Sequence, residues 1–105
     1  MEERVQTIVA ILDEKKAEEI QVFDMSEQEY FVECVIIATT LGEKHGLALV
    51  DELKVQLKAR GEEFLHTEVS EEWVVLDLGD ILIHLITSEY RELYNLEELL
   101  ENLKR

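Results

Sequence analysis

Two strand-forming runs separated by three residues constrain the fold of this chain most. They lie in WVVLDLGDILIHLI, residues 73–86, on either side of the letters LGD. Glycine accepts the positive φ that a two-residue hairpin turn requires, so Gly79 suits such a turn. We predict strands at residues 73–77 and 81–87, with Leu78-Gly79 as the link between them. The chain must therefore build a β-sheet around this hairpin.

Three more segments have the composition of strands. CVIIAT, residues 34–39, is a continuous apolar run, which is typical of a strand buried on both faces near the middle of a sheet. Residues 20–24 are β-compatible, and residues 64–69 alternate weakly, as expected of a more exposed strand. Five strands are therefore predicted in all.

Helical periodicity is present in three places. Apolar residues recur with i, i+3, i+4, i+7 spacing in residues 3–17, which predicts a first helix. Residues 43–60 carry a second apolar stripe, and Gly61 follows as a C-terminal stop. A last helix with a leucine stripe is predicted near the C-terminus. Asn95 followed by Glu98 three residues later is typical of a helix start, so this helix should begin near Asn95.

The order of these elements predicts the fold class. Helix, two strands, helix, three strands and helix make an α/β chain of mixed α+β type, with a single mixed five-stranded sheet and helices packed on it. A length of 105 residues, without proline, repeat or linker, predicts one domain over residues 1–105.

Acidic residues dominate the charge of the chain. There are 25 acidic and 10 basic residues, for a formal net charge of −15. Nucleic-acid binding gains most of its affinity from clustered cations, which this sequence lacks, so we expect no direct binding to nucleic acid. The excess of acidic residues has two interpretations, which both stay open. It keeps a small protein soluble, or it attracts a basic protein partner.

The cellular location is predicted from three features. No apolar run approaches the roughly 18 residues of a membrane span, so no membrane association is expected. The N-terminus places acids before its apolar stretch and does not resemble a signal peptide. The single cysteine, Cys34, suits a reducing cytoplasm. We expect a cytoplasmic protein with Cys34 as a buried structural thiol, and a nucleophilic role for Cys34 is the alternative.

Asp77 and Asp80 raise the question of a catalytic or metal-binding pair. Across a tight hairpin they lie at facing strand ends, where two like charges repel unless they are exposed, hydrogen-bonded or bridged by a cation. A metal needs further ligands, and His84 is roughly 13 Å from Asp80 in an extended strand. Aspartate also favours turns through bonds to the backbone. We prefer that structural interpretation and expect no catalytic residue, metal or cofactor.

Trp73 and Leu78 have a structural and a functional interpretation. Trp73 is the only tryptophan, and it either packs on the sheet or anchors an interface, where tryptophan is enriched. Leu78 is expected at the tip of the turn. Since turn tips usually carry polar residues, an apolar side chain there indicates contact with a partner.

Several segments together resemble a known family. KKAEEIQVFDMS resembles its opening motif, ECVIIATTLGEKH its following strand and loop, and EEWVVLDLGDILIHLI its tryptophan-led hairpin. YRELYNLEELL is similar to its R-x-x-Y-x-L-E segment. These motifs cover nearly the whole chain and resemble the ribosomal silencing factors, also called the Iojap or RsfS family.

The resemblance implies a fold related to nucleotidyltransferases without their activity. It also implies binding to the large ribosomal subunit through a basic protein, large-subunit ribosomal protein fourteen, so that the small subunit cannot join and translation is repressed when nutrients run low. Members are often dimers when free, so a homodimer is expected. By position, the residues that the resemblance assigns to the partner-binding surface are Glu71, Glu72, Trp73, Asp77, Leu78, Asp80 and Tyr94.

The chain departs from the family pattern at three places. Residues 39–42 read TTLG where the family has T-G-x-S, residues 33–35 read ECV where it has D-Y-F, and Leu100 replaces a final tryptophan. These changes concern the loop 39–46 and the edge of a dimer, and they leave the hairpin intact. Two other functions stay as alternatives: an acidic adaptor for another basic protein, and a residual nucleotide- or metal-dependent enzyme.

Overall fold

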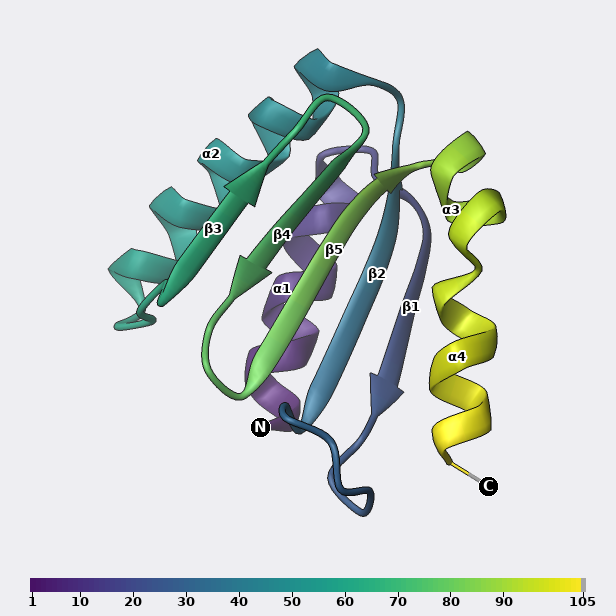
Figure 1. The fold of residues 1–105 in the computed structure, drawn as a ribbon. Coiled ribbons are helices and arrows are strands. Elements are labelled where there is room, and N and C mark those ends of the chain that lie inside the picture. Colours follow the sequence, from purple (N-terminus) through teal and green to yellow (C-terminus); the bar gives the residue numbers. More distant parts are fainter. Residues whose placement is uncertain (105) are drawn as a thin grey trace.

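The computed structural model describes residues 1–104 and contains five strands and four helices (Figure 1). The helices are α1 (Glu2–Glu14), α2 (Glu43–Ala59), α3 (Ser88–Tyr94) and α4 (Leu96–Leu103). The strands are β1 (Glu18–Asp24), β2 (Cys34–Thr40), β3 (His66–Val69), β4 (Trp73–Asp77) and β5 (Ile81–Thr87). In this part of the chain, no helix is long and apolar enough to cross a bilayer.

The strands form one mixed sheet in the order β1-β2-β5-β4-β3. β2 and β5 are parallel, and the other three neighbouring pairs are antiparallel. Every residue of β2 is buried, which is the expected result for a continuous apolar run at the centre of a sheet. The predicted mixed five-stranded sheet is confirmed, with β1 and β3 as its edge strands.

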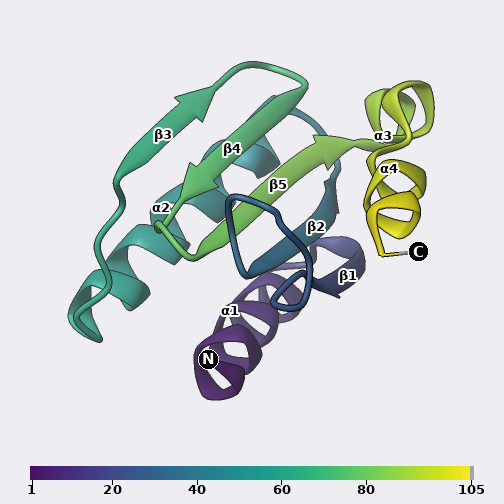
Figure 2. The same cartoon turned by 60° about the horizontal axis from the view of Figure 1, so that its bottom comes forward.

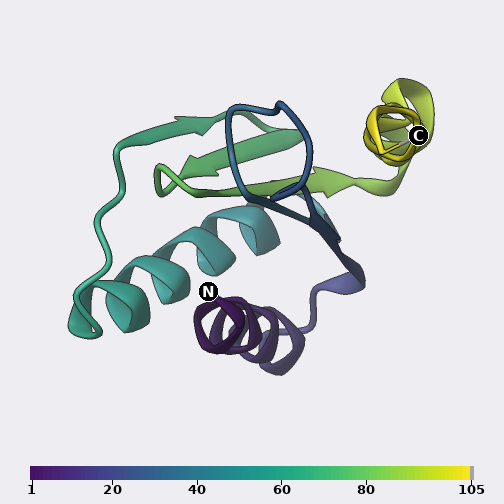
Figure 3. The same cartoon turned by 90° about the horizontal axis from the view of Figure 1, so that it is seen from below.

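The two faces of the sheet are covered differently. Helices α1 and α2 lie on one face, where their apolar stripes pack on side chains such as Ile36, Leu76 and Ile83 (Figure 3). We call the opposite face the outer face. There α3, α4 and the loop 25–33 cover the side of β1 and β2, and β3 and β4 are left more open (Figures 2 and 3).

The C-terminal segment differs from the prediction of one last helix. A separate helix, α3, precedes α4, and Asn95 joins the two in the left-handed conformation with φ of 45°. Asn95 therefore ends one helix and begins the next. Asparagine tolerates this conformation better than most residues, which explains the break. The predicted start of the last helix at Asn95 is confirmed, whereas α3 has only seven residues and too little periodicity to be recognised.

The predicted turn of the β4–β5 hairpin is wrong by one residue. The Leu78 N–H donates to the Ile81 carbonyl at 2.9 Å, so the two-residue turn is Gly79-Asp80. Gly79 has a φ of 95°, as its place in the turn requires. Leu78 belongs to the ladder, and its side chain enters the core beside α1 and α2 with an exposed fraction of 7%. The expectation of an exposed leucine at the tip is wrong.

Candidate functional site

A cluster of aromatic side chains lies on the outer face, where β4 meets α3. The ring centroids of Trp73 and Tyr94 are 5.2 Å apart, and those of Tyr94 and Tyr90 are 5.7 Å apart. Trp73 is half-buried, whereas Tyr94 has an exposed fraction of 54%. Aromatic rings in such tilted arrangements stabilise each other, and they also offer a large rigid surface to a partner.

Strand alternation brings acidic groups to the same face. Trp73, Val75 and Asp77 are alternate residues of β4 and point to the outer face, and Glu68 of β3 pairs with Val75. A shallow hollow of about 370 Å³ is lined by Glu68, Val69, Ser70, Trp73 and Val75. An apolar floor therefore has carboxylates beside it.

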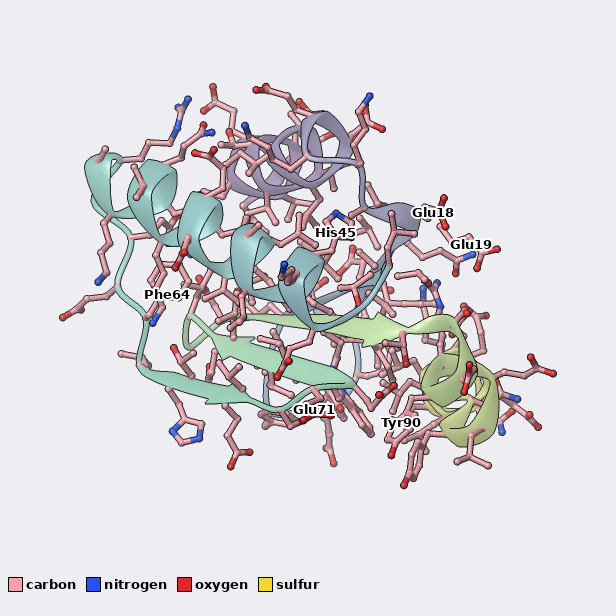
Figure 4. The ribbon with its side chains drawn as sticks, turned by 90° about the horizontal axis from the view of Figure 1, so that it is seen from above. Glu18, Glu19, His45, Phe64, Glu71 and Tyr90 are labelled. Carbon is pink, nitrogen blue, oxygen red and sulfur yellow. The ribbon has the colours of Figure 1, made fainter. Side chains whose placement is uncertain are left out.

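Glu71 extends this surface at the turn between β3 and β4. Figure 4 shows Glu71 and Tyr90 at the same end of the sheet. Glu71 is exposed, whereas Glu72 is half-buried and its carboxylate accepts a hydrogen bond from the Thr87 hydroxyl at 2.9 Å. We use the name aromatic patch for Glu68, Glu71, Trp73, Val75, Asp77, Tyr90 and Tyr94.

His84, on the neighbouring strand β5, contacts Trp73 on the same face of the sheet. The indole N–H of Trp73 donates to Nδ1 of His84 at 3.0 Å, which fixes the orientation of the indole ring. Burial lowers the pKa of His84 to about 4, so the imidazole is neutral at pH 7 and accepts this bond. His84 is therefore a packed, hydrogen-bonded side chain.

Arg91 holds α3 and α4 against the sheet. Its guanidinium is buried and donates to the Glu19 carbonyl at 2.7 Å and to the Thr39 hydroxyl at 2.9 Å. It also forms an ion pair with Glu97 at 3.1 Å. Tyr94 lies one helical turn after Arg91, so these contacts fix its position beside Trp73. This role is not apparent from the sequence, although both charged residues belong to the R-x-x-Y-x-L-E segment.

Asp77 and Asp80 serve separate structural purposes. Asp77 accepts the Gly79 N–H at 2.8 Å, which stabilises the turn. Asp80 instead accepts two bonds from the Arg4 guanidinium, at 2.6 and 2.9 Å, and Glu62 binds the same guanidinium. This ion pair lowers the pKa of Asp80. The hairpin turn is thereby tied to α1.

A metal site is not formed by these aspartates. Among residues 1–104, no group of three or more His, Cys, Asp or Glu side chains is arranged to hold a metal ion. Cys34 is buried, as predicted, and burial raises the pKa of its thiol to about 11. A thiol with that pKa is protonated at neutral pH and is a poor nucleophile.

The predicted partner-binding residues fall into two groups. Glu71, Trp73, Asp77 and Tyr94 belong to the aromatic patch, with Glu72 beside it. Trp73 and Tyr94 are in contact there, whereas Asp77 lies at the opposite end of β4 from Trp73. The other two are elsewhere: Leu78 is buried under the opposite face, and Asp80 is paired with Arg4 at the hairpin turn.

A family of known proteins matches this chain over its whole length. The family model described as ribosomal silencing factor during starvation matches residues 1–105. A protein of Halalkalibacterium halodurans named ribosomal silencing factor RsfS is 33% identical over 93% of this chain and 86% of its own length. A relative of the same name in Bacillus subtilis is 33% identical over 86% of this chain and 78% of its own length.

Solved structures have the same fold. A crystal structure from Chromobacterium violaceum, 27% identical, superposes with a TM-score of 0.89 over 95% of this chain and 85% of its own. A second one, from Bacillus halodurans, is 32% identical with a TM-score of 0.83 and covers 94% of both chains. By its sequence and by its fold, this chain belongs to the ribosomal silencing factor family.

Proposed function

We propose that this chain represses translation by binding the large ribosomal subunit through a basic ribosomal protein. Once bound, it sterically prevents the small subunit from joining. The partner implied by the sequence resemblance is large-subunit ribosomal protein fourteen. The aromatic patch is the docking surface, with Trp73 and Tyr94 as its apolar centre.

The observation that carries the proposal is the combination of aromatic rings and carboxylates in the aromatic patch. Partly exposed tryptophan and tyrosine side chains are the residues most often found at binding hot spots. The carboxylates of Glu68, Glu71 and Asp77 on the same face complement a basic surface, and the net charge of −15 attracts such a partner over a longer range.

The names of the relatives support the choice of partner. Several are named ribosomal silencing factors. A mouse relative, 26% identical over 90% of this chain and 44% of its own length, is named for mitochondrial assembly of the ribosomal large subunit. The proposal requires no catalysis, and the buried thiol and separated aspartates supply no reacting group.

Co-sedimentation with isolated ribosomal subunits tests the proposal directly. The chain should pellet with large subunits and stay in solution with small ones. Salt should weaken the binding, because it screens the attraction between acidic and basic surfaces. Equal recovery with both subunits contradicts the proposal and favours a general acidic adaptor.

A substitution in the aromatic patch tests the docking surface. Tyr94→Ala should weaken large-subunit binding by about thirtyfold, the effect of removing a hot-spot side chain worth about 2 kcal/mol. The matched control is Leu47→Ala on α2, which has an exposed fraction of 45% and lies on the other side of the sheet. If both variants bind like the parent, the aromatic patch is not the docking surface.

Subunit joining is measured on sucrose gradients. Large subunits loaded with the chain should fail to associate with added small subunits, whereas large subunits loaded with Tyr94→Ala at the same concentration should associate. Normal joining in the presence of saturating bound protein would exclude the steric mechanism while leaving the binding itself established.

A residual enzyme is tested separately. Each nucleoside triphosphate is incubated with the chain and with Mg²⁺ or Mn²⁺. The silencing function predicts no turnover. Turnover that is lost on substituting Asp77 or Asp80 would establish the enzyme instead.

We also propose that the free chain self-associates reversibly. Leu93, Leu99 and Leu103 are exposed on α3 and α4, and burying them in a dimer removes apolar surface from water. The net charge opposes the association, so added salt should tighten it. Sedimentation of a monomer at high protein and salt concentrations would contradict this.

A further inference from the structure

A groove on the α1 side of the sheet is separate from the aromatic patch. One hollow, of about 570 Å³, is formed by the N-terminal part of the chain, between α1 and the edge strand β1. A second, of about 580 Å³, adjoins it, because Val5 and Val22 line both. Figure 3 shows β1 at the edge of the sheet, beside α1. We call these two hollows the α1–β1 groove.

The floor of the groove is apolar. Val5 and Val9 of α1 are half-buried, as is Ile20 of β1, and Ala17 between the two elements is buried. Val22 of β1 has an exposed fraction of 45%. Aliphatic side chains from a helix and from a strand thus face one channel.

The backbone of β1 is open along the same channel. The Met25 N–H donates to the Glu33 carbonyl, and Phe23 pairs with Val35 in the same register. In an antiparallel ladder, backbone groups point alternately toward and away from the partner strand. Val22 and Asp24 therefore direct their N–H and C=O groups to the free edge of the sheet.

The charged side chains that line the groove have one sign. Asp13 and Glu19 lie at one end, and Glu2, Asp24 and Glu33 lie at the other. Among the described residues that line the two hollows, none is lysine or arginine. Figure 4 shows Glu18 and Glu19 projecting outward at the start of β1.

We propose that the α1–β1 groove binds an extended peptide segment of another protein, which adds to the sheet beside β1. The segment alternates aliphatic and basic residues. Its backbone pairs with Val22, and its aliphatic side chains enter the groove between β1 and α1. Its basic side chains point to the other face by strand alternation and are attracted by the acidic field of the chain. About five extended residues span roughly 17 Å, which matches Ile20–Asp24. This site is additional to the ribosome-binding surface and is independent of it.

A second copy of the chain is a poor occupant. Each copy carries a formal net charge of −15, so the acidic ends of the groove repel it. A basic segment has the opposite charge and gains from the same field. Charge complementarity therefore favours a basic peptide segment over a second copy of the chain as the occupant of the groove.

The probe is a synthetic hexapeptide, Lys-Val-Arg-Val-Lys-Val, titrated into the labelled full chain and followed by NMR amide shifts. Saturable shifts should centre on Val22 and its neighbours in β1 and α1. A scrambled peptide of the same composition and an N-methylated peptide, which cannot donate backbone hydrogen bonds, should each bind at least about tenfold more weakly.

A matched pair of variants locates the site. Val22→Lys should weaken the alternating peptide about tenfold or more, because it places a like charge in the groove. Val69→Lys, at a similar exposed fraction of 50% on the other edge strand, should leave the affinity unchanged. Equal affinity of the N-methylated peptide, shifts centred on another surface, or filling of the groove by a second copy would each overturn the proposal.

Discussion

Trp73 and His84 are joined by a hydrogen bond of 3.0 Å between the indole N–H and Nδ1 of the imidazole. The two residues lie on neighbouring strands, β4 and β5, and both point to the outer face. The bond requires an imidazole that is unprotonated at Nδ1. The surface that carries Trp73 is therefore linked to the protonation state of a half-buried histidine.

The first prediction concerns the pH dependence of stability through His84. Its pKa is about 4 in the folded chain and 6.5 when unperturbed, so the unfolded state takes up the proton first as pH falls. The contribution of neutral His84 to the free energy of unfolding is complete above pH 6.5 and is lost progressively as the pH falls toward 4. The loss should reach up to about 3 kcal/mol in the free energy of unfolding.

Urea denaturation at several pH values measures this loss. The control is His84→Asn, whose amide oxygen replaces Nδ1 as an acceptor and does not titrate. The stability of the parent should fall more steeply than that of the variant between pH 6.5 and 4. Parallel curves for the two proteins would contradict the role of His84.

The second prediction is that Leu78→Glu destabilises the fold. Leu78 is in the core beneath α1 and α2, so the substitution buries an unpaired carboxylate and should cost about 3 kcal/mol or more. Leu93→Glu is the matched control, since Leu93 has an exposed fraction of 71%. It should change the unfolding free energy by less than about 0.5 kcal/mol. Equal thermal midpoints for the two variants would show that Leu78 is exposed after all.

The third prediction concerns the ion pair between Arg4 and Asp80. Their side chains have exposed fractions of 33% and 37%, so solvent weakens the attraction. A double-mutant cycle with Arg4→Met and Asp80→Ala should give a coupling energy of about 1 kcal/mol at low salt. High salt should reduce it. A coupling energy of zero would mean that the Arg4–Asp80 pair does not help to hold the hairpin turn against α1.

The fourth prediction is that Arg91→Met detaches α3 and α4 locally. The substitution leaves the Glu19 carbonyl, the Thr39 hydroxyl and the Glu97 carboxylate without this donor, at a cost of about 3 kcal/mol. Amide hydrogen exchange in α4 should accelerate, whereas exchange in β2 changes less.

The control for Arg91 is Arg60→Met at the C-terminal end of α2, where the side chain is exposed. It should leave the exchange of α4 amides unchanged. If both variants leave α4 equally protected, the apolar contacts of Leu96 and Leu100 are sufficient to hold the helix.

The strands, the longer helices and the composition of the core could be predicted from the sequence. These follow from local periodicity, because apolar residues that recur every two or every 3.6 positions indicate a strand or a helix and the side of it that is buried. The apolar run of residues 34–39 predicted the central strand that the structure has at Cys34–Thr40, and the stripe of residues 43–60 predicted a helix on the sheet. The sequence motifs also indicated the family.

The tertiary structure decided how the charged and turn residues are used. Asp80 resembles Asp77 in the sequence, yet its partner Arg4 is 76 positions away, and no local pattern encodes that distance. Leu78 looked like a turn residue until the register with Ile81 placed it in the ladder. A shift of one residue moves a side chain to the other face of a sheet, so register, and not composition, set its burial.

The candidate site was likewise predictable from the sequence only in part. Trp73 and the acidic residues near it could be selected from the sequence, because their residue types suit a protein interface. Their position beside Tyr94 depends on Arg91, whose buried guanidinium joins β1, β2 and α4. Burying a charge is favourable only when several groups from distant segments converge on it, and that convergence exists only in the folded chain.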